Sequence, residues 1–87
     1  MSYRIEVSKS AGREIAALPK RDGRRVVSAI AALADDPRPR GVRKLIGAED
    51  AYRVRVGDYR IIYQIADNVL TVFVVRVRDR KDVYRRR

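Results

Sequence analysis

The sequence predicts a small α+β fold in a single domain over residues 1–87, and three patterns support this prediction. A short alternating strand opens the chain, two amphipathic helices follow as a hairpin, and three strands rich in Val, Ile and Tyr come last. We expect these last strands to form a three-stranded antiparallel meander with a short C-terminal tail. At 46% hydrophobic residues, the chain can bury one modest core.

The first 20 residues predict a strand and a helix. Apolar and charged residues alternate over 3–7, which is typical of a strand. Ser8 or Ser10 can cap a helix that runs to about Leu18, and Pro19 ends it. The buried face of this helix is expected to hold Ala11, Ile15 and Leu18.

A second helix is expected over 22–34, ahead of an Asp-Asp-Pro terminator. Its apolar residues recur at helical spacing and are assigned to the core: Val26, Ile30 and Leu33. The following segment, 38–44, is a basic loop with turn residues. Its cations either contact ribosomal RNA or face solvent: Arg38, Arg40, Arg43 and Lys44.

The stretch 52–65, Tyr-Arg-Val-Arg-Val-Gly-Asp-Tyr-Arg-Ile-Ile-Tyr-Gln-Ile, predicts a β-hairpin. Its central Gly-Asp pair can supply the positive φ angles that tight hairpin turns need. The resulting register places Arg55 opposite Arg60 and brings Arg53 to the same side of the sheet. Because like charges placed opposite each other cost stability, this cluster is expected to serve a polyanion.

A last strand is expected over 69–77, after a turn at 67–68, and its apolar run suits a central strand. Strict alternation from the hairpin places Phe73 and Val75 on the arginine side of the sheet. It directs the other apolar side chains toward the helices: Tyr59, Ile61, Tyr63, Leu70, Val72 and Val74.

The composition is strongly basic, with a net charge of +10 and a pI near 10.8. Most of the 21 basic residues are arginine, whose planar fork fits phosphate oxygens two at a time and thus favours nucleic acid as the partner. A GC-rich genome is the alternative explanation for the arginine bias.

The chain has no cysteine and no histidine. It therefore lacks the commonest metal ligands, and any catalysis must use Arg, Lys, Tyr, Asp or Glu. No apolar run approaches the roughly 20 residues of a membrane span. We expect a cytoplasmic protein with no membrane partner and no cofactor.

The order of the elements, the hairpin motif and the closing R-K-D-V-Y-R resemble the RelE/ParE toxin superfamily, specifically its RelE branch. The segment S-K-S-A-G-R-E-I-A-A-L-P-K is also similar to that family, and the likeness covers nearly the whole chain. The resemblance implies a toxin of a type II toxin–antitoxin pair that enters the ribosomal A site and cuts messenger RNA there. The implied partners are an acidic, RelB-like antitoxin and the 70S ribosome with its mRNA and rRNA.

The resemblance also implies a metal-free site in which the ribose 2′-hydroxyl attacks the neighbouring phosphate. The matching catalytic positions are Arg53, Arg55, Arg60, Arg80 and Tyr84, with Arg78 as an alternative to Arg80. Arg60, braced against Arg55, is the first choice for phosphate stabilisation. Further contacts to RNA are expected from Arg43, Lys44, Arg78, Lys81 and Arg85.

Proton transfer is harder to assign, because this chain has arginine on the second strand where relatives carry lysine. Tyr84 is the matched candidate, since surrounding guanidinium groups would lower the pKa of its phenol from roughly 10. Lys81, Glu49 and Asp50 are held in reserve.

Two other functions compete with the nuclease. One is a ParE-like module that binds DNA gyrase and cuts nothing. The other is a nonenzymatic binder of RNA or the ribosome, because a basic sheet without histidine could bind without cleaving.

Overall fold

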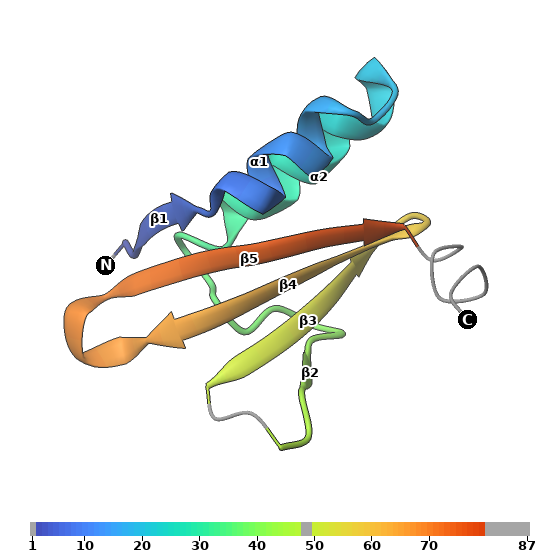
Figure 1. Cartoon of the computed structure of the whole chain (residues 1–87). Helices are drawn as coiled ribbons and strands as arrows, with labels where there is room; N and C mark the ends of the chain where they lie inside the picture. Colours follow the sequence, from blue (N-terminus) through green and yellow to red (C-terminus); the bar gives the residue numbers. More distant parts are fainter. Residues whose placement is uncertain (1, 48–49, 80–87) are drawn as a thin grey trace.

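The computed structural model describes residues 2–47 and 50–79, which form a helical layer on a five-stranded sheet. Helices α1 (Lys9–Ala16) and α2 (Lys20–Ala32) lie together on one side of the sheet (Figure 1). The strands are β1 (Arg4–Val7), β2 (Arg43–Lys44), β3 (Ala51–Val56), β4 (Tyr59–Ala66) and β5 (Thr71–Asp79). Their order is β1-β5-β4-β3-β2, with β1 parallel to β5 and the other pairs antiparallel. The predicted α+β fold is confirmed.

The local sequence sets the ends of both helices. The Ser8 hydroxyl accepts a hydrogen bond from the backbone N–H of Ala11 at 3.0 Å, so Ser8 is the N-cap of α1. The same hydroxyl donates to the carbonyl of Val75 at 2.7 Å, which ties the helix start to β5. Pro19, at φ −53° and ψ 146°, separates the helices and is the N-cap of α2, which starts two residues earlier than predicted.

The core lies between the helices and the sheet. The helical segment contributes Ala11, Val26, Ile30 and Leu33, as predicted. The sheet contributes Tyr52, Ile61, Tyr63, Ile65, Val72, Val74 and Val77. Ile15 and Leu18 are partly buried at the edge of this cluster. Among the described residues, no helix is long and apolar enough to cross a membrane.

The pairing of β4 with β5 is irregular between Ile62 and Tyr63. Tyr63 pairs with Val74, whereas its neighbour Ile62 pairs with Arg76, so the register skips Val75. One extra residue on β5 is the mark of a β-bulge, which reverses the side to which later residues of that strand point. The prediction that one strict alternation runs through this strand is therefore wrong.

The bulge matters for the arginines. Phe73, which precedes it, is 36% exposed and lies opposite Gln64, on the predicted side. Beyond it, Val77 is 4% exposed in the core, although uninterrupted alternation from Phe73 would place it on the arginine side. The same reversal sets Arg78 opposite Arg60.

Two segment boundaries also differ from the prediction. The last strand begins at Thr71 rather than Val69, because residues Asp67–Val69 form a 3-10 turn and Leu70 has a positive φ of 48°. The placement of Leu70 in a strand is therefore wrong. Strand β2 was not predicted, because two residues are too short for any periodicity to be recognised.

Candidate nucleic-acid interface

Four arginines line a hollow of about 320 Å³, together with Gly41. These arginines are Arg43, Arg53, Arg55 and Arg60, and we call the hollow the arginine groove. Three of them were predicted to gather on one side of the hairpin, and the structure brings them together. The fourth, Arg43, was predicted only as a further RNA contact.

Strand pairing explains why these side chains meet. In β3, Arg53 and Arg55 flank Val54, which packs against the core, so the two arginines point to the other side of the sheet. The antiparallel register sets Arg60 of β4 opposite Arg55, as predicted. Strand β2 sets Arg43 opposite Arg53. The groove therefore depends on three neighbouring strands.

The arginine groove is electrostatically unbalanced. Within residues 2–47 and 50–79, its four arginines form no ion pair with a carboxylate. Like charges facing each other across strands destabilise a sheet by roughly 0.2–1 kcal/mol per pair. A bound anion would offset this repulsion and accept hydrogen bonds from the guanidinium N–H groups. This surface can therefore bind an extended anion such as a nucleic-acid backbone.

A glycine turn brings the loop from α2 to the groove. The backbone N–H of Val42 donates to the carbonyl of Pro39 at 3.1 Å, which closes a four-residue turn. Gly41, the third residue of that turn, has φ 88°, a conformation that residues with a side chain rarely adopt. The turn is followed directly by Arg43 in β2.

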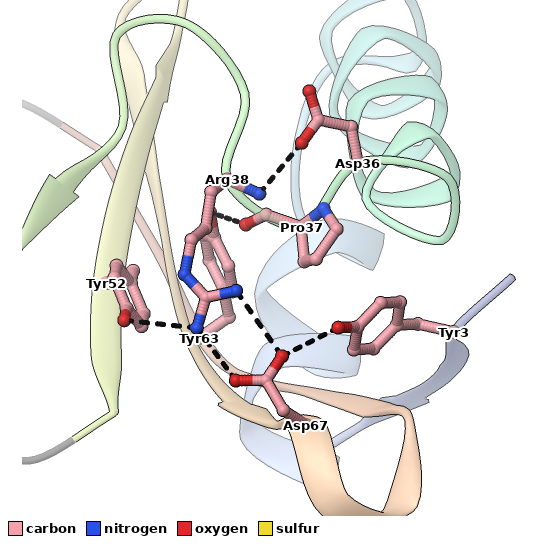
Figure 2. A network of polar contacts seen from close by, with 7 residues as sticks. All are labelled: Tyr3, Asp36, Pro37, Arg38, Tyr52, Tyr63 and Asp67. Atoms are coloured by element: carbon pink, nitrogen blue, oxygen red, sulfur yellow. Dashed lines mark hydrogen bonds and ion pairs between the residues drawn. The ribbon is translucent and has the colours of Figure 1, made fainter. Parts of the chain in front are cut away.

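Arg38 does not line the arginine groove, and its guanidinium is paired with a carboxylate. Figure 2 shows its guanidinium between Asp67 and Tyr52, donating to the two carboxylate oxygens of Asp67 at 2.9 and 3.3 Å. It also lies 5.2 Å from the ring centroid of Tyr52. The hydrogen bonds from Arg38 and Tyr3 hold the pKa of the Asp67 carboxyl below its usual value. Arg38 is therefore not simply solvated, and its prediction as an RNA contact stays a prediction.

Arg76 is likewise paired. Its guanidinium donates two hydrogen bonds to one Glu14 oxygen at 2.7 and 3.0 Å, and the other oxygen accepts the backbone N–H of Val77 at 2.7 Å. Burial raises the pKa of Glu14, but the bonds from Arg76 and Val77 outweigh it and lower the pKa below its usual value. Glu14 thus fixes β5 just before Arg78.

Three tyrosines of the described part are poorly suited to accept a proton at neutral pH. The hydrogen bond from the Tyr59 hydroxyl to Asp22, 2.8 Å long, raises the pKa of Tyr59 to about 12. Burial raises the pKa of Tyr63 to about 12, and its hydroxyl donates to the Pro37 carbonyl. The hydrogen bond from Tyr3 to Asp67 also raises the pKa of Tyr3.

The other predicted site residues fall into two groups. Lys44 lies on β2 opposite Tyr52 and does not line the arginine groove, and neither does the exposed Asp50. Arg78 lies opposite Arg60 in the β4–β5 register. The remaining predictions fall outside the described residues: Glu49, Arg80, Lys81, Tyr84 and Arg85.

Sequence analysis did not single out Gly41, Glu14 or Asp67 as residues that shape this surface. For Gly41 a signal existed, since a glycine within a basic loop indicates a turn with positive φ. For Glu14 and Asp67 there was none, because their partners are 62 and 29 positions away in the chain.

Known proteins are similar to this chain in both sequence and fold. Residues 5–84 match the family described as ParE toxin of type II toxin-antitoxin system, parDE. The chain is 37% identical to Toxin RelG of Mycobacterium tuberculosis over 90 residues, covering 99% of this chain and 100% of RelG. It is 31% identical to a putative RelE-like toxin protein of Escherichia coli, covering 97% of this chain and 92% of that protein.

Solved structures agree with these relatives. The RelE–RelB complex from Pyrococcus horikoshii OT3 gives a TM-score of 0.82 at 33% identity, covering 92% of this chain and 97% of that chain. The isolated RelE toxin of Escherichia coli gives a TM-score of 0.78 at 26% identity, covering 97% of this chain and 93% of that one.

The family match, the fold and the basic sheet surface define a toxin of a type II toxin–antitoxin system. Within that class, the chain belongs to the RelE/ParE toxin superfamily and is RelE-like.

Proposed function

We propose that this toxin is a ribosome-dependent endoribonuclease that cleaves messenger RNA in the ribosomal A site and so inhibits translation. The observation that carries the proposal is the arginine groove, whose four cations lie together without carboxylate partners in the described part of the chain. RNA presents phosphates along its backbone, and arginine binds them with directional hydrogen bonds. The toxin would act in the cytoplasm as one domain over residues 1–87.

The bonds that form and break in the proposed reaction all belong to the RNA. The ribose 2′-oxygen forms a bond to the adjacent phosphorus, and the bond from phosphorus to the 5′-oxygen breaks. The products are a 2′,3′-cyclic phosphate and a free 5′-hydroxyl. One proton leaves the 2′-hydroxyl and one joins the departing 5′-oxygen.

The groove arginines suit the charge that builds up on the phosphate during this attack. They remain protonated, and a positioned donor stabilises developing charge more than it stabilises the ground state. Arg60, with Arg55 beside it, is assigned to the phosphate, and Arg53 orients the backbone. Arg80 is assigned to the backbone on the other side by family resemblance alone.

Tyr84 is assigned to proton transfer, also by resemblance. The hydroxyls of Tyr3, Tyr59 and Tyr63 already donate hydrogen bonds within the fold. The ribosome is proposed to align the 2′-hydroxyl with the neighbouring phosphate. The arginines cannot accept the proton of that hydroxyl, because they stay protonated.

An antitoxin is the proposed cellular partner. Two similar structures, from Pyrococcus horikoshii and Mycobacterium tuberculosis, are toxin–antitoxin complexes. An acidic antitoxin would complement the net charge of +10 and cover the arginine groove. This would restrain the toxin until the antitoxin is removed.

Mapping RNA 5′ ends on a ribosome-bound message, with and without the toxin, tests the nuclease. New ends within the A-site codon are expected, and naked message should give little product. The alternative is gyrase inhibition without cleavage, which the ParE description of the matching family favours. An intact message together with inhibited DNA supercoiling would replace the proposal by this alternative.

A further inference from the structure

The loop over 37–42 links the end of α2 to the arginine groove, and its first residues are held firmly. The buried Pro37 offers its carbonyl to the Tyr63 hydroxyl at 2.8 Å. The next residue, Arg38, forms the bidentate ion pair with Asp67. Five residues after Arg38, the chain supplies Arg43 to the groove.

Two tyrosines extend this ion pair, one bonded to Asp67 and the other to Arg38. Its Oδ1 accepts a hydrogen bond from the Tyr3 hydroxyl at 2.6 Å, and Arg38 also donates to the Tyr52 hydroxyl at 3.4 Å (Figure 2). We call Tyr3, Arg38, Tyr52 and Asp67 the Arg38 clamp. It connects the N-terminal segment, the loop, β3 and the β4–β5 turn, and none of its members lines the arginine groove.

The clamp is too exposed to be a main source of global stability. The side chains of Arg38 and Asp67 are 43% and 53% exposed, and ion pairs of this kind contribute about 0–1 kcal/mol. The strand that carries Arg43 has only two residues and lies at the sheet edge, where local order depends on neighbouring contacts. The clamp therefore has its main effect on the order of the loop.

We propose that the Arg38 clamp is a positioning device for RNA binding: through the loop over 37–42 it holds Arg43 in place on the arginine groove. This inference rests on the proposed function in that it takes RNA as the ligand of the groove. Arg38 and Asp67 act through Arg43 and touch no RNA themselves.

The Asp67→Asn variant separates positioning from simple electrostatics. It removes one negative charge, so charge alone predicts tighter RNA binding. Loss of the bidentate pair frees the loop, and positioning predicts weaker binding by about fivefold, on the scale of one weakened phosphate contact. The measurement is the dissociation constant for a labelled short single-stranded RNA of mixed sequence, at fixed ionic strength.

The same substitution in an Arg43→Ala background completes a double-mutant cycle. If the clamp acts through Arg43, Asp67→Asn should cause no loss of affinity once Arg43 is gone. Unchanged or tighter binding of Asp67→Asn in the parent protein would overturn the inference. An equal loss in both backgrounds would also overturn it, because the clamp would then act by another route.

Two further variants provide an independent test and a control. Arg38→Lys keeps the charge but cannot reproduce the two-pronged contact, so it should weaken RNA binding as Asp67→Asn does. It also serves if Asp67→Asn fails to fold, which a melting curve would reveal. Arg40→Ala removes a cation from the same loop and leaves the clamp residues in place. The loss of RNA affinity that it causes should be as large in the Arg43→Ala background as in the parent protein.

The readout is binding, not cleavage. A protein that binds RNA through Arg43 but leaves a ribosome-bound message intact would refute the proposed function and leave this inference standing. A protein that cleaves the message but shows no coupling between Asp67 and Arg43 would support the proposed function and overturn this inference.

Discussion

Replacing Arg60 with alanine should remove message cleavage while leaving the fold intact. Arg60 faces Arg55 across the hairpin, within the arginine groove, and fills no core position. Relief of this like-charge pair is worth roughly 0.2–1 kcal/mol and offsets the packing lost from the stem of the side chain. We therefore expect the free energy of unfolding to change by less than about 1 kcal/mol.

The effect on chemistry should be much larger. Removing one positioned donor from a developing oxyanion costs about 10²–10³ in rate in well-studied enzymes. Arg60→Ala should lower the single-turnover rate of cleavage on ribosome-bound message by that factor. Thermal unfolding of the same preparation, followed by circular dichroism, checks the fold.

Arg24→Ala is the matched control, because Arg24 is an exposed cation on α2 that does not line the groove. It removes the same charge and should cleave at nearly the parent rate. Equal losses in Arg60→Ala and Arg24→Ala would refute the phosphate role, since net charge alone would then explain both. A steep fall in melting temperature for Arg60→Ala would instead show a structural role.

Two other predictions concern proton transfer and acid stability. Tyr84→Phe should lower the single-turnover rate by about 10²-fold or more with ribosome affinity unchanged, and a parent-like rate would remove Tyr84 from the catalytic set. Glu14→Gln should destabilise the fold by about 1 kcal/mol near neutral pH, after discounting the partly exposed Arg76 for screening. Because the folded-state pKa of Glu14 is lowered, this stabilisation is complete above the unfolded value of about 4.3 and is lost as pH falls through the folded value. Melting temperatures of Glu14→Gln should therefore depend less on pH in that acid range than those of the parent, and parallel curves would contradict the assignment.

Local patterns were enough to predict the helices and the hairpin. Two-residue periodicity and the Gly-Asp turn fix the register that joins Arg55 to Arg60, because hairpin geometry depends on neighbouring residues alone. Ser8 and Pro19 mark helix ends through equally local chemistry.

The sequence analysis missed three further features for physical reasons. The bulge that skips Val75 breaks the two-residue alternation on which the prediction depends, although β4 and β5 are neighbours in the chain. The parallel pairing of β1 with β5 and the contact of Glu14 with Arg76 join segments far apart in the chain. Single-sequence periodicity carries no information on such pairings. For the same reason, the sequence did not predict which arginines pair with carboxylates, as Arg38 does, and which line the groove.

The central claim is that the four arginines of the groove bind RNA phosphates, while Arg38 and Arg76 stay paired with carboxylates and do not contact the RNA. Titration of the toxin with a short single-stranded RNA, followed through the arginine side-chain Nε–Hε signals by nuclear magnetic resonance, tests it most directly. The signals of the groove arginines should shift together and saturate, while those of Arg38 and Arg76 stay in place because carboxylates already hold them. Uniform shifts over all arginines, or shifts of Arg38 and Arg76 ahead of the groove, would contradict the account.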